Sequence, residues 1–230
     1  MSTDAPVAAS KVDGPADHRD RAGAAGRAAR RWFLIASPVL AGLFAILGAA
    51  ADPAVGQDGI VLYREYAANP DPLQFKSVGF HFSYAFWIMS AMMLAALVRS
   101  RGVWVANVAG FLGWLGISSL PGLLFVDFYD SAIGQVGGAE LTERVNQQME
   151  GMWGVPVFAL PGVIGLMLAL PIAVAAAWRA GILRWWSLAA VLAGQAAFMV
   201  SGVAVWGTAL TAACFTVFAV ALWRGTRPAG

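Results

Sequence analysis

Long runs of apolar residues, separated by short polar stretches, make up most of the chain after residue 31. About 20 apolar residues in a helix, each rising ~1.5 Å, match the ~30 Å hydrocarbon core of a bilayer. Residues 185–223 hold almost forty uncharged positions, too many for one crossing, and Ser201 and Gly202 mark the break. The pattern therefore predicts six transmembrane helices, at 32–51, 78–98, 103–126, 153–178, 185–202 and 205–223.

The predicted fold class is all-α: a polytopic membrane protein with a six-transmembrane-helix bundle over residues 31–224. Residues 1–30 have no apolar periodicity and predict a disordered cytoplasmic tail, because they cannot bury enough surface to offset the entropy of ordering. Residues 225–230 form a second, short cytoplasmic tail. The polar stretches 52–77 and 127–152 become outer loops.

The composition agrees with a bilayer location, since 59% of residues are hydrophobic and only 12% are charged. A soluble domain carries about a quarter charged residues, so an ordinary cytosolic enzyme is excluded. Cys214 is the single cysteine and can form neither an internal disulfide nor a cysteine-rich metal site.

The charges predict which side each loop occupies. With the N-terminus in the cytoplasm and six spans, twelve of the fifteen basic residues lie on the cytoplasmic side, and nine of the thirteen acids lie outside. Basic residues near span ends concentrate on the cytoplasmic side. We therefore expect both termini to be cytoplasmic.

Small residues predict where the helices pack, because helices in lipid associate by close backbone approach. Ala189, Ala193 and Ala197 form a row that predicts a central place for helix 185–202, and Gln195 is expected to bond across helices. Glycines offer narrow faces on three other helices: Gly42, Gly48, Gly110, Gly113, Gly116, Gly162 and Gly165.

Ionisable residues within spans are rare and costly, so they are the first candidates for a site. His81 and Tyr84 lie near the outer end of helix 78–98, and Asp127 and Asp130 close the outer end of helix 103–126. These two helices form a hairpin, so their outer ends can meet. With Glu150 nearby, these residues form a candidate polar pocket facing outward.

Three interpretations of this group stay open. A histidine beside carboxylates suits a proton-coupled site, since imidazole titrates near neutral pH. One nitrogen and several oxygens, Glu150 included, could bind a divalent cation. Alternatively, His81 bonds a backbone carbonyl or Tyr84, and the aspartates only end a helix. We assign no catalytic residue, no metal and no cofactor to the group.

The outer loops carry their own pattern. Residues 138–149 place Leu141, Val145 and Met149 on one helical stripe, opposite charged and amide side chains, and predict a short amphipathic helix. Residues 52–77 are too polar and proline-rich to cross, and are long enough for a small cap.

In layout the chain resembles small six-helix integral membrane proteins of high-GC bacteria whose function is not established. The likeness lies in the usage of Ala, Gly and Arg, the polar first outer loop, and the Phe-Val-Asp-Phe-Tyr-Asp end of the third span at 125–130. The resemblance implies a bundle in the bacterial inner membrane and no particular activity.

The leading functional expectation is a non-enzymatic small transport or accessory membrane subunit. A first alternative is an intramembrane enzyme acting on a lipid or isoprenoid, which requires a laterally open cavity beside the outer polar groups. A second is a docking platform for another membrane protein. Haem ligation by two histidines is excluded because only His81 lies in a span. Expected partners are the lipid bilayer and a second copy or another membrane protein, and no nucleic acid.

Overall fold

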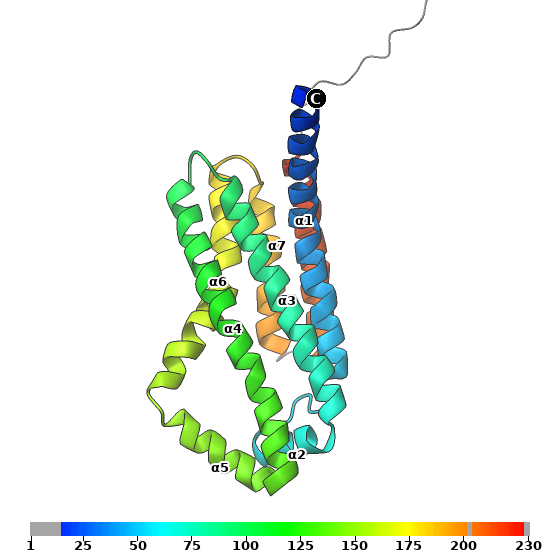
Figure 1. Ribbon diagram of the computed structural model, residues 1–230, viewed down its shortest axis with the longest axis vertical. Coiled ribbons are helices and arrows are strands. Elements are labelled where there is room, and N and C mark those ends of the chain that lie inside the picture. The colour runs from blue at the N-terminus through cyan, green and yellow to red at the C-terminus, as the bar shows by residue number, and fades with distance from the viewer. Residues whose placement is uncertain (1–14, 202–203, 228–230) are drawn as a thin grey trace, which may run out of the picture. The chain divides into compact units, whose positions relative to one another are not determined.

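The computed structural model describes residues 15–201 and 204–227, and all regular structure in these ranges is α-helical (Figure 1). The helices are α1 (Pro15–Ala51), α2 (Gly59–Ala68), α3 (Pro70–Leu97), α4 (Val103–Gly137), α5 (Ala139–Glu150), α6 (Gly154–Arg179), α7 (Trp185–Ser201) and α8 (Val205–Gly225).

Five of these helices, α1, α3, α4, α6 and α8, are long and apolar enough to cross a membrane. α7 is equally apolar in character but has 17 residues. The chain is therefore a multi-pass helical membrane protein.

α1 begins earlier than expected. It starts at Pro15, inside the segment predicted as a disordered tail, so residues 15–30 are helical, and residues 1–14 of that prediction lie outside the described part of the chain. Alanine and arginine are strong helix formers, and their repeated use here outweighs the cost of Gly23 and Gly26. Residues 34–230 form one compact unit, and the packing described below lies within it.

Two spans also extend further than predicted into the polar stretches. α3 begins at Pro70, where proline suits the first helical position and Asp71 suits the first turn. α4 continues past Asp127 to Gly137, so residues 127–137 of the predicted loop 127–152 belong to this helix. The polar side chains of these extensions are tied to neighbouring helices.

The stretches between the spans form a small cap, as the polar pattern predicted. The amphipathic helix expected at 138–149 is confirmed as α5. α2 packs against α4 and α5, and Ala54, Tyr66 and Leu73 make a small buried cluster beneath it. We call the end of the bundle that carries α2 and α5 the cap end (Figure 1).

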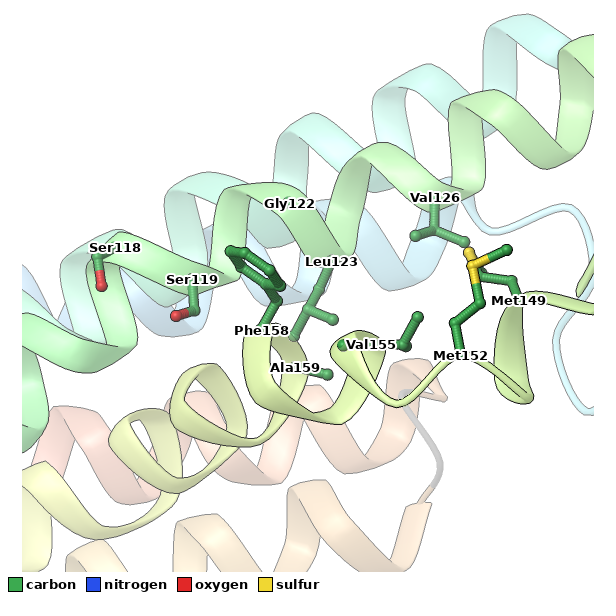
Figure 2. Close-up of a pocket in the computed structure, with 11 residues that line it drawn as sticks. Ser118, Ser119, Gly122, Leu123, Val126, Met149, Met152, Val155, Phe158 and Ala159 are labelled. Carbon is green, nitrogen blue, oxygen red and sulfur yellow. The ribbon is translucent and has the colours of Figure 1, made fainter.

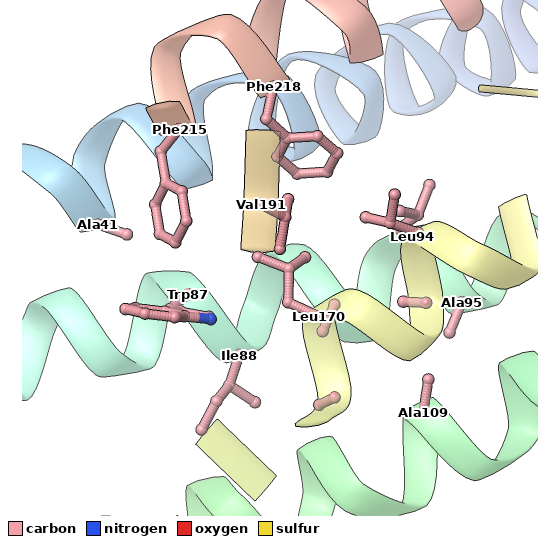
Figure 3. Close-up of a cluster of buried hydrophobic side chains, with 14 of the residues drawn as sticks. Ala41, Trp87, Ile88, Leu94, Ala95, Ala109, Leu170, Val191, Phe215 and Phe218 are labelled. Atoms are coloured by element: carbon pink, nitrogen blue, oxygen red, sulfur yellow. The ribbon is translucent and has the colours of Figure 1, made fainter. Parts of the chain in front are cut away.

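The main hydrophobic core is centred on α3. Trp87 is buried, and its ring meets Phe215 of α8 edge to face with centroids 4.7 Å apart and Phe198 of α7 at 5.7 Å. In Figure 3 the ring of Trp87 lies below Phe215, and Ile88 extends from α3 on the side away from Phe215. α3 also packs against α4 and α6, and Oγ of Ser83 donates a hydrogen bond to the carbonyl of Ala41 on α1. α3 therefore contacts α1, α4, α6, α7 and α8.

Glycines mark the closest helix crossings, as expected. A Cβ atom added to Gly165 of α6 would lie 2.5 Å from the Cα of Gly116 of α4, and one added to Gly79 of α3 would lie 2.6 Å from the Cα of Gly48 of α1. Gly110 differs, because nothing lies within 4 Å of its added Cβ. The α4 and α6 backbones therefore touch at Gly116 and Gly165.

The alanine row predicted on α7 is packed only in part. Ala197 is buried, but Ala189 and Ala193 are exposed, and the buried face of α7 also carries Val191 and Gln195. Gln195 fixes which face of α7 is turned toward α6, because its Nε2 donates a hydrogen bond of 2.7 Å to the carbonyl of Met167 on α6. The expected bond of Gln195 across helices is therefore confirmed.

Candidate functional site

A buried ion pair joins α3 and α4 at the cap end. Nζ of Lys76 lies 3.1 Å from Oδ2 of Asp127, and Oγ of Ser77 donates a 3.0 Å hydrogen bond to the same carboxylate oxygen. Lys76 also donates to the phenol oxygen of Tyr66, and Nζ lies 4.4 Å from the centre of that ring. Lys76 is only 9% exposed, so its charge depends on these partners. We call Tyr66, Lys76, Ser77 and Asp127 the Lys76 cluster.

A second polar group ties α4 to the cap helices. Nδ2 of Asn146 on α5 donates a 2.7 Å hydrogen bond to Oδ1 of Asp130, and Oγ1 of Thr142 donates to the Asp130 carbonyl at 3.3 Å. Oγ of Ser131 donates a 2.8 Å bond to the carbonyl of Tyr66 on α2. The part of α4 at the cap end therefore holds both cap helices, α2 and α5, through these hydrogen bonds.

The predicted site residues are only partly brought together. Asp127 and Asp130 belong to the two polar groups above, and Tyr84 packs its ring against Phe198 at 6.1 Å. His81 is half-buried and lies beside the ring of Phe82. In the described residues the partners of Asp127 are Lys76 and Ser77, and His81 is not among them. Glu150 is exposed at the end of α5.

Sequence reasoning left Lys76 in a loop. The missed signal is the start of α3: once Pro70 opens the helix, Lys76 shares a face with Phe80 and Ser83, which are both buried. A lysine on a buried helical face requires a partner of opposite charge. Asp127 was the nearest acid available on the neighbouring span.

The pKa values of two tyrosines on α2, Tyr63 and Tyr66, are raised by their surroundings. Burial raises the pKa of Tyr66 to about 12, against an ordinary value of 10.0. The pKa of Tyr63 is also raised, first by burial and then by the negative charges of Asp130, Glu150 and Glu143. Both phenols therefore stay neutral near pH 7, and the oxygen of Tyr66 remains available to accept from Lys76.

An apolar pocket lies between α4 and α6, with the end of α5 at one edge (Figure 2). Its volume is about 470 Å³. We call it the α4–α6 pocket. It is lined by Ser118, Ser119, Gly122, Leu123, Val126, Met149, Met152, Gly154, Val155, Phe158 and Ala159.

The pocket results from how the two helices separate. They touch at Gly116 and Gly165 and diverge toward the cap end, where α5 leads back to α6 (Figure 1). Gly122 contributes no side chain to fill the space, and nothing lies within 4 Å of a Cβ added there. No titratable side chain lines the pocket. The hydroxyl of Ser118 donates a 2.9 Å hydrogen bond to the carbonyl of Leu115 in its own helix.

Metal binding finds no support in the described residues, where no three His, Cys, Asp or Glu side chains are grouped to hold an ion. The fold and the site thus define a multi-pass helical membrane protein that has two polar groups at its cap end and an apolar pocket between α4 and α6. Comparison of the chain with protein-family models, curated proteins and solved structures gives no match.

Proposed function

We propose that this protein binds the apolar chain of a membrane lipid or isoprenoid in the α4–α6 pocket. The observation that carries the proposal is the pocket itself: about 470 Å³ of space between two helices long enough to span the bilayer, lined by apolar side chains. Ligand sites in proteins measure roughly 300–1,000 Å³ and are predominantly apolar.

The bilayer is the source of the occupant because of where the pocket lies. The neighbouring surface of α6 is apolar and exposed, with Phe158 76% exposed, and Trp153 just before the helix is 85% exposed. In a span, such side chains face lipid tails. A hydrocarbon chain that leaves the bilayer for the pocket exchanges one apolar surrounding for another and needs no aqueous path.

The features of the pocket support lipid binding better than they support catalysis or transport. An intramembrane enzyme needs an acid or a base at the bound chain, and no titratable side chain lines the space. Transport coupled to protons or cations receives less support, because the charges of Lys76 and Asp127 are held by one another. In this proposal the Lys76 cluster keeps α4 in place and so maintains the shape of the pocket.

The proposal includes six crossings in the bacterial inner membrane with both termini in the cytoplasm. α7 is the span that raises the number of crossings from five to six, and it is the fifth along the chain: its 17 residues reach about 26 Å at 1.5 Å each. Local thinning of the bilayer accommodates a span that is a few ångströms short at modest cost. The arginines at the end opposite the cap then lie on the cytoplasmic side, whereas Arg64 and Arg144 lie outside with the cap end.

Labelling in liposomes tests the proposal. The probe is a phosphatidylcholine with a diazirine on one acyl chain, activated by light, with peptide mapping of the labelled residues. We expect labelling of Met149, Met152 and Phe158 that saturates with probe and is competed by unlabelled lipid. Gly122→Phe adds a large ring at a position that lines the pocket and whose Cβ meets open space, and should abolish the saturable labelling.

Gly110→Phe is the matched control, because Gly110 lies on the same helix, has equal open space around an added Cβ and does not line the pocket. Its labelling should match that of the unmodified protein. Labelling that never saturates would show that the pocket holds no specific chain. An equal change of labelling in Gly122→Phe and Gly110→Phe would show the same.

A further inference from the structure

The end of the bundle opposite the cap carries an exposed positive surface. Three segments form it: the α3–α4 connection, the α6–α7 connection and the end of α8. Each contributes two exposed arginines. We call this surface the arginine end; its members are Arg99, Arg101, Arg179, Arg184, Arg224 and Arg227.

Close backbone packing makes the three segments one surface. A Cβ added to Gly102 would lie 2.9 Å from the carbonyl oxygen of Ala176, so the α3–α4 connection rests on the end of α6. One added to Gly225 would lie 2.3 Å from the carbonyl oxygen of Ile182, so the end of α8 rests on the α6–α7 connection. The arginines on these segments therefore lie on one face.

No acid in the same parts of the chain balances these charges. Asp and Glu are absent from 72–126 and from 151–230, which include every segment of the arginine end. The compact unit therefore presents six positive charges there without a carboxylate from its own segments. A surface of this kind attracts anions in the layer where it lies.

Tryptophans fix the depth of the surface. Trp104, Trp178, Trp185 and Trp223 are exposed, and each lies within one helical turn of an arginine. Exposed tryptophans occupy the headgroup level of a bilayer. The guanidinium of Arg227 lies 3.8 Å from the centre of the Trp223 ring, which holds the charge at that level.

We propose that the arginine end binds the headgroup phosphates of anionic phospholipids and so selects these lipids around the protein. Guanidinium groups match phosphate geometry with two parallel hydrogen bonds, and they are held where the phosphates of a leaflet lie. The inference goes beyond chain binding in the α4–α6 pocket, since it concerns the headgroup and the other end of the molecule.

Native mass spectrometry of the full-length protein tests this inference. The protein in detergent is mixed with equal amounts of phosphatidylglycerol and phosphatidylcholine that carry identical acyl chains, so chain binding in the pocket cannot create a preference. We expect bound phosphatidylglycerol to exceed phosphatidylcholine about fivefold or more, since each arginine near an anionic lipid contributes about 1 kcal/mol.

Arg99→Gln with Arg101→Gln should reduce the preference several-fold. Arg64→Gln with Arg144→Gln is the matched control, because these exposed arginines lie at the cap end and should leave the preference unchanged. Equal affinity for the two lipids, or equal loss in both variants, would overturn the inference. Displacement of the lipid by inorganic phosphate, beyond that caused by chloride at equal ionic strength, would overturn it in favour of a free-phosphate site.

Discussion

Lys76 of α3 and Asp127 of α4 form an ion pair with a 3.1 Å separation between Nζ and Oδ2, and the side chain of Lys76 is 11% exposed. Fifty residues of sequence separate the two, so the pair fixes the register of α3 against α4. Removing one partner leaves the other charge largely buried with only a hydroxyl group to stabilise it, which costs far more than the pair itself contributes.

Lys76→Met should therefore lower the free energy of unfolding by about 3–5 kcal/mol, measured by denaturation in detergent. Lys76→Met with Asp127→Leu should recover most of that loss, since neither charge then remains. Arg64→Met is the control: Arg64 and Glu140 are 4.0 Å apart and well exposed, so little change is expected. A double variant as unstable as Lys76→Met would contradict the prediction.

High pH should destabilise the cap through Tyr66. Burial raises its pKa to about 12 from 10.0, so the unfolded chain releases the phenol proton first. The stabilisation is complete below pH 10 and is lost as the pH rises through 12. Circular dichroism across this range should show a steeper loss of stability in the unmodified protein than in Tyr66→Phe. Equal slopes would show that Tyr66 titrates as it does in the unfolded chain.

The bond between Asn146 and Asp130 should hold α5 in place. Asn146→Ala removes the 2.7 Å bond to Asp130 and should cost about 1–3 kcal/mol of local stability. Amide hydrogen exchange in 139–150 should speed up, while exchange in α3 stays slow. Gln147→Ala, one position along and exposed, should leave exchange unchanged. Protection retained in Asn146→Ala would mean that apolar contacts alone hold α5.

The crossing of α4 and α6 should not tolerate a single methyl group. In Gly165→Ala the added Cβ would lie 2.4 Å from the carbonyl oxygen of Leu112 and 2.5 Å from the Cα of Gly116. Because both are backbone atoms, the helices must separate, with a loss of roughly 1–3 kcal/mol or more. Thermal unfolding measures this loss, and Gly110→Ala, with open space around the new atom, serves as the unaffected reference.

Whether α7 crosses the membrane can be tested directly. Reporter enzymes fused to the two ends should both be active in the cytoplasm if α7 crosses as a span of 17 residues. Activity on opposite sides would show an odd number of crossings, and the proposed orientation of the cap end would be wrong.

The sequence was sufficient to locate the spans but not their ends at the cap. Apolar run length identifies a span because the bilayer sets its length. It fails at Pro70 and beyond Asp127, where polar residues remain helical once α2 and α5 supply partners. The pairing of Lys76 with Asp127 depends on the relative register of α3 and α4, which no local pattern encodes.

A cavity was expected from the sequence only as a requirement of one alternative, an intramembrane enzyme acting on a lipid or isoprenoid, and the sequence did not predict where a pocket would lie. The α4–α6 pocket depends on the angle between two helices that touch at Gly116 and Gly165, and on the absence of a side chain at Gly122. Gly116 and Gly165 were predicted from the sequence as packing positions, whereas Gly122 was not singled out. Which of them would touch a neighbour and which would leave space could not be predicted without the structure.

The six guanidinium groups of the arginine end also constrain how the molecule can be inserted and assembled. Turning the protein over in the membrane would drag all six through hydrocarbon, at about 2.5–3.5 kcal/mol each by insertion scales, so a molecule keeps the orientation in which it was made. Copies that are all inserted with the arginine end retained in the cytoplasm would keep that shared orientation, so any two that associate side by side would form a parallel pair.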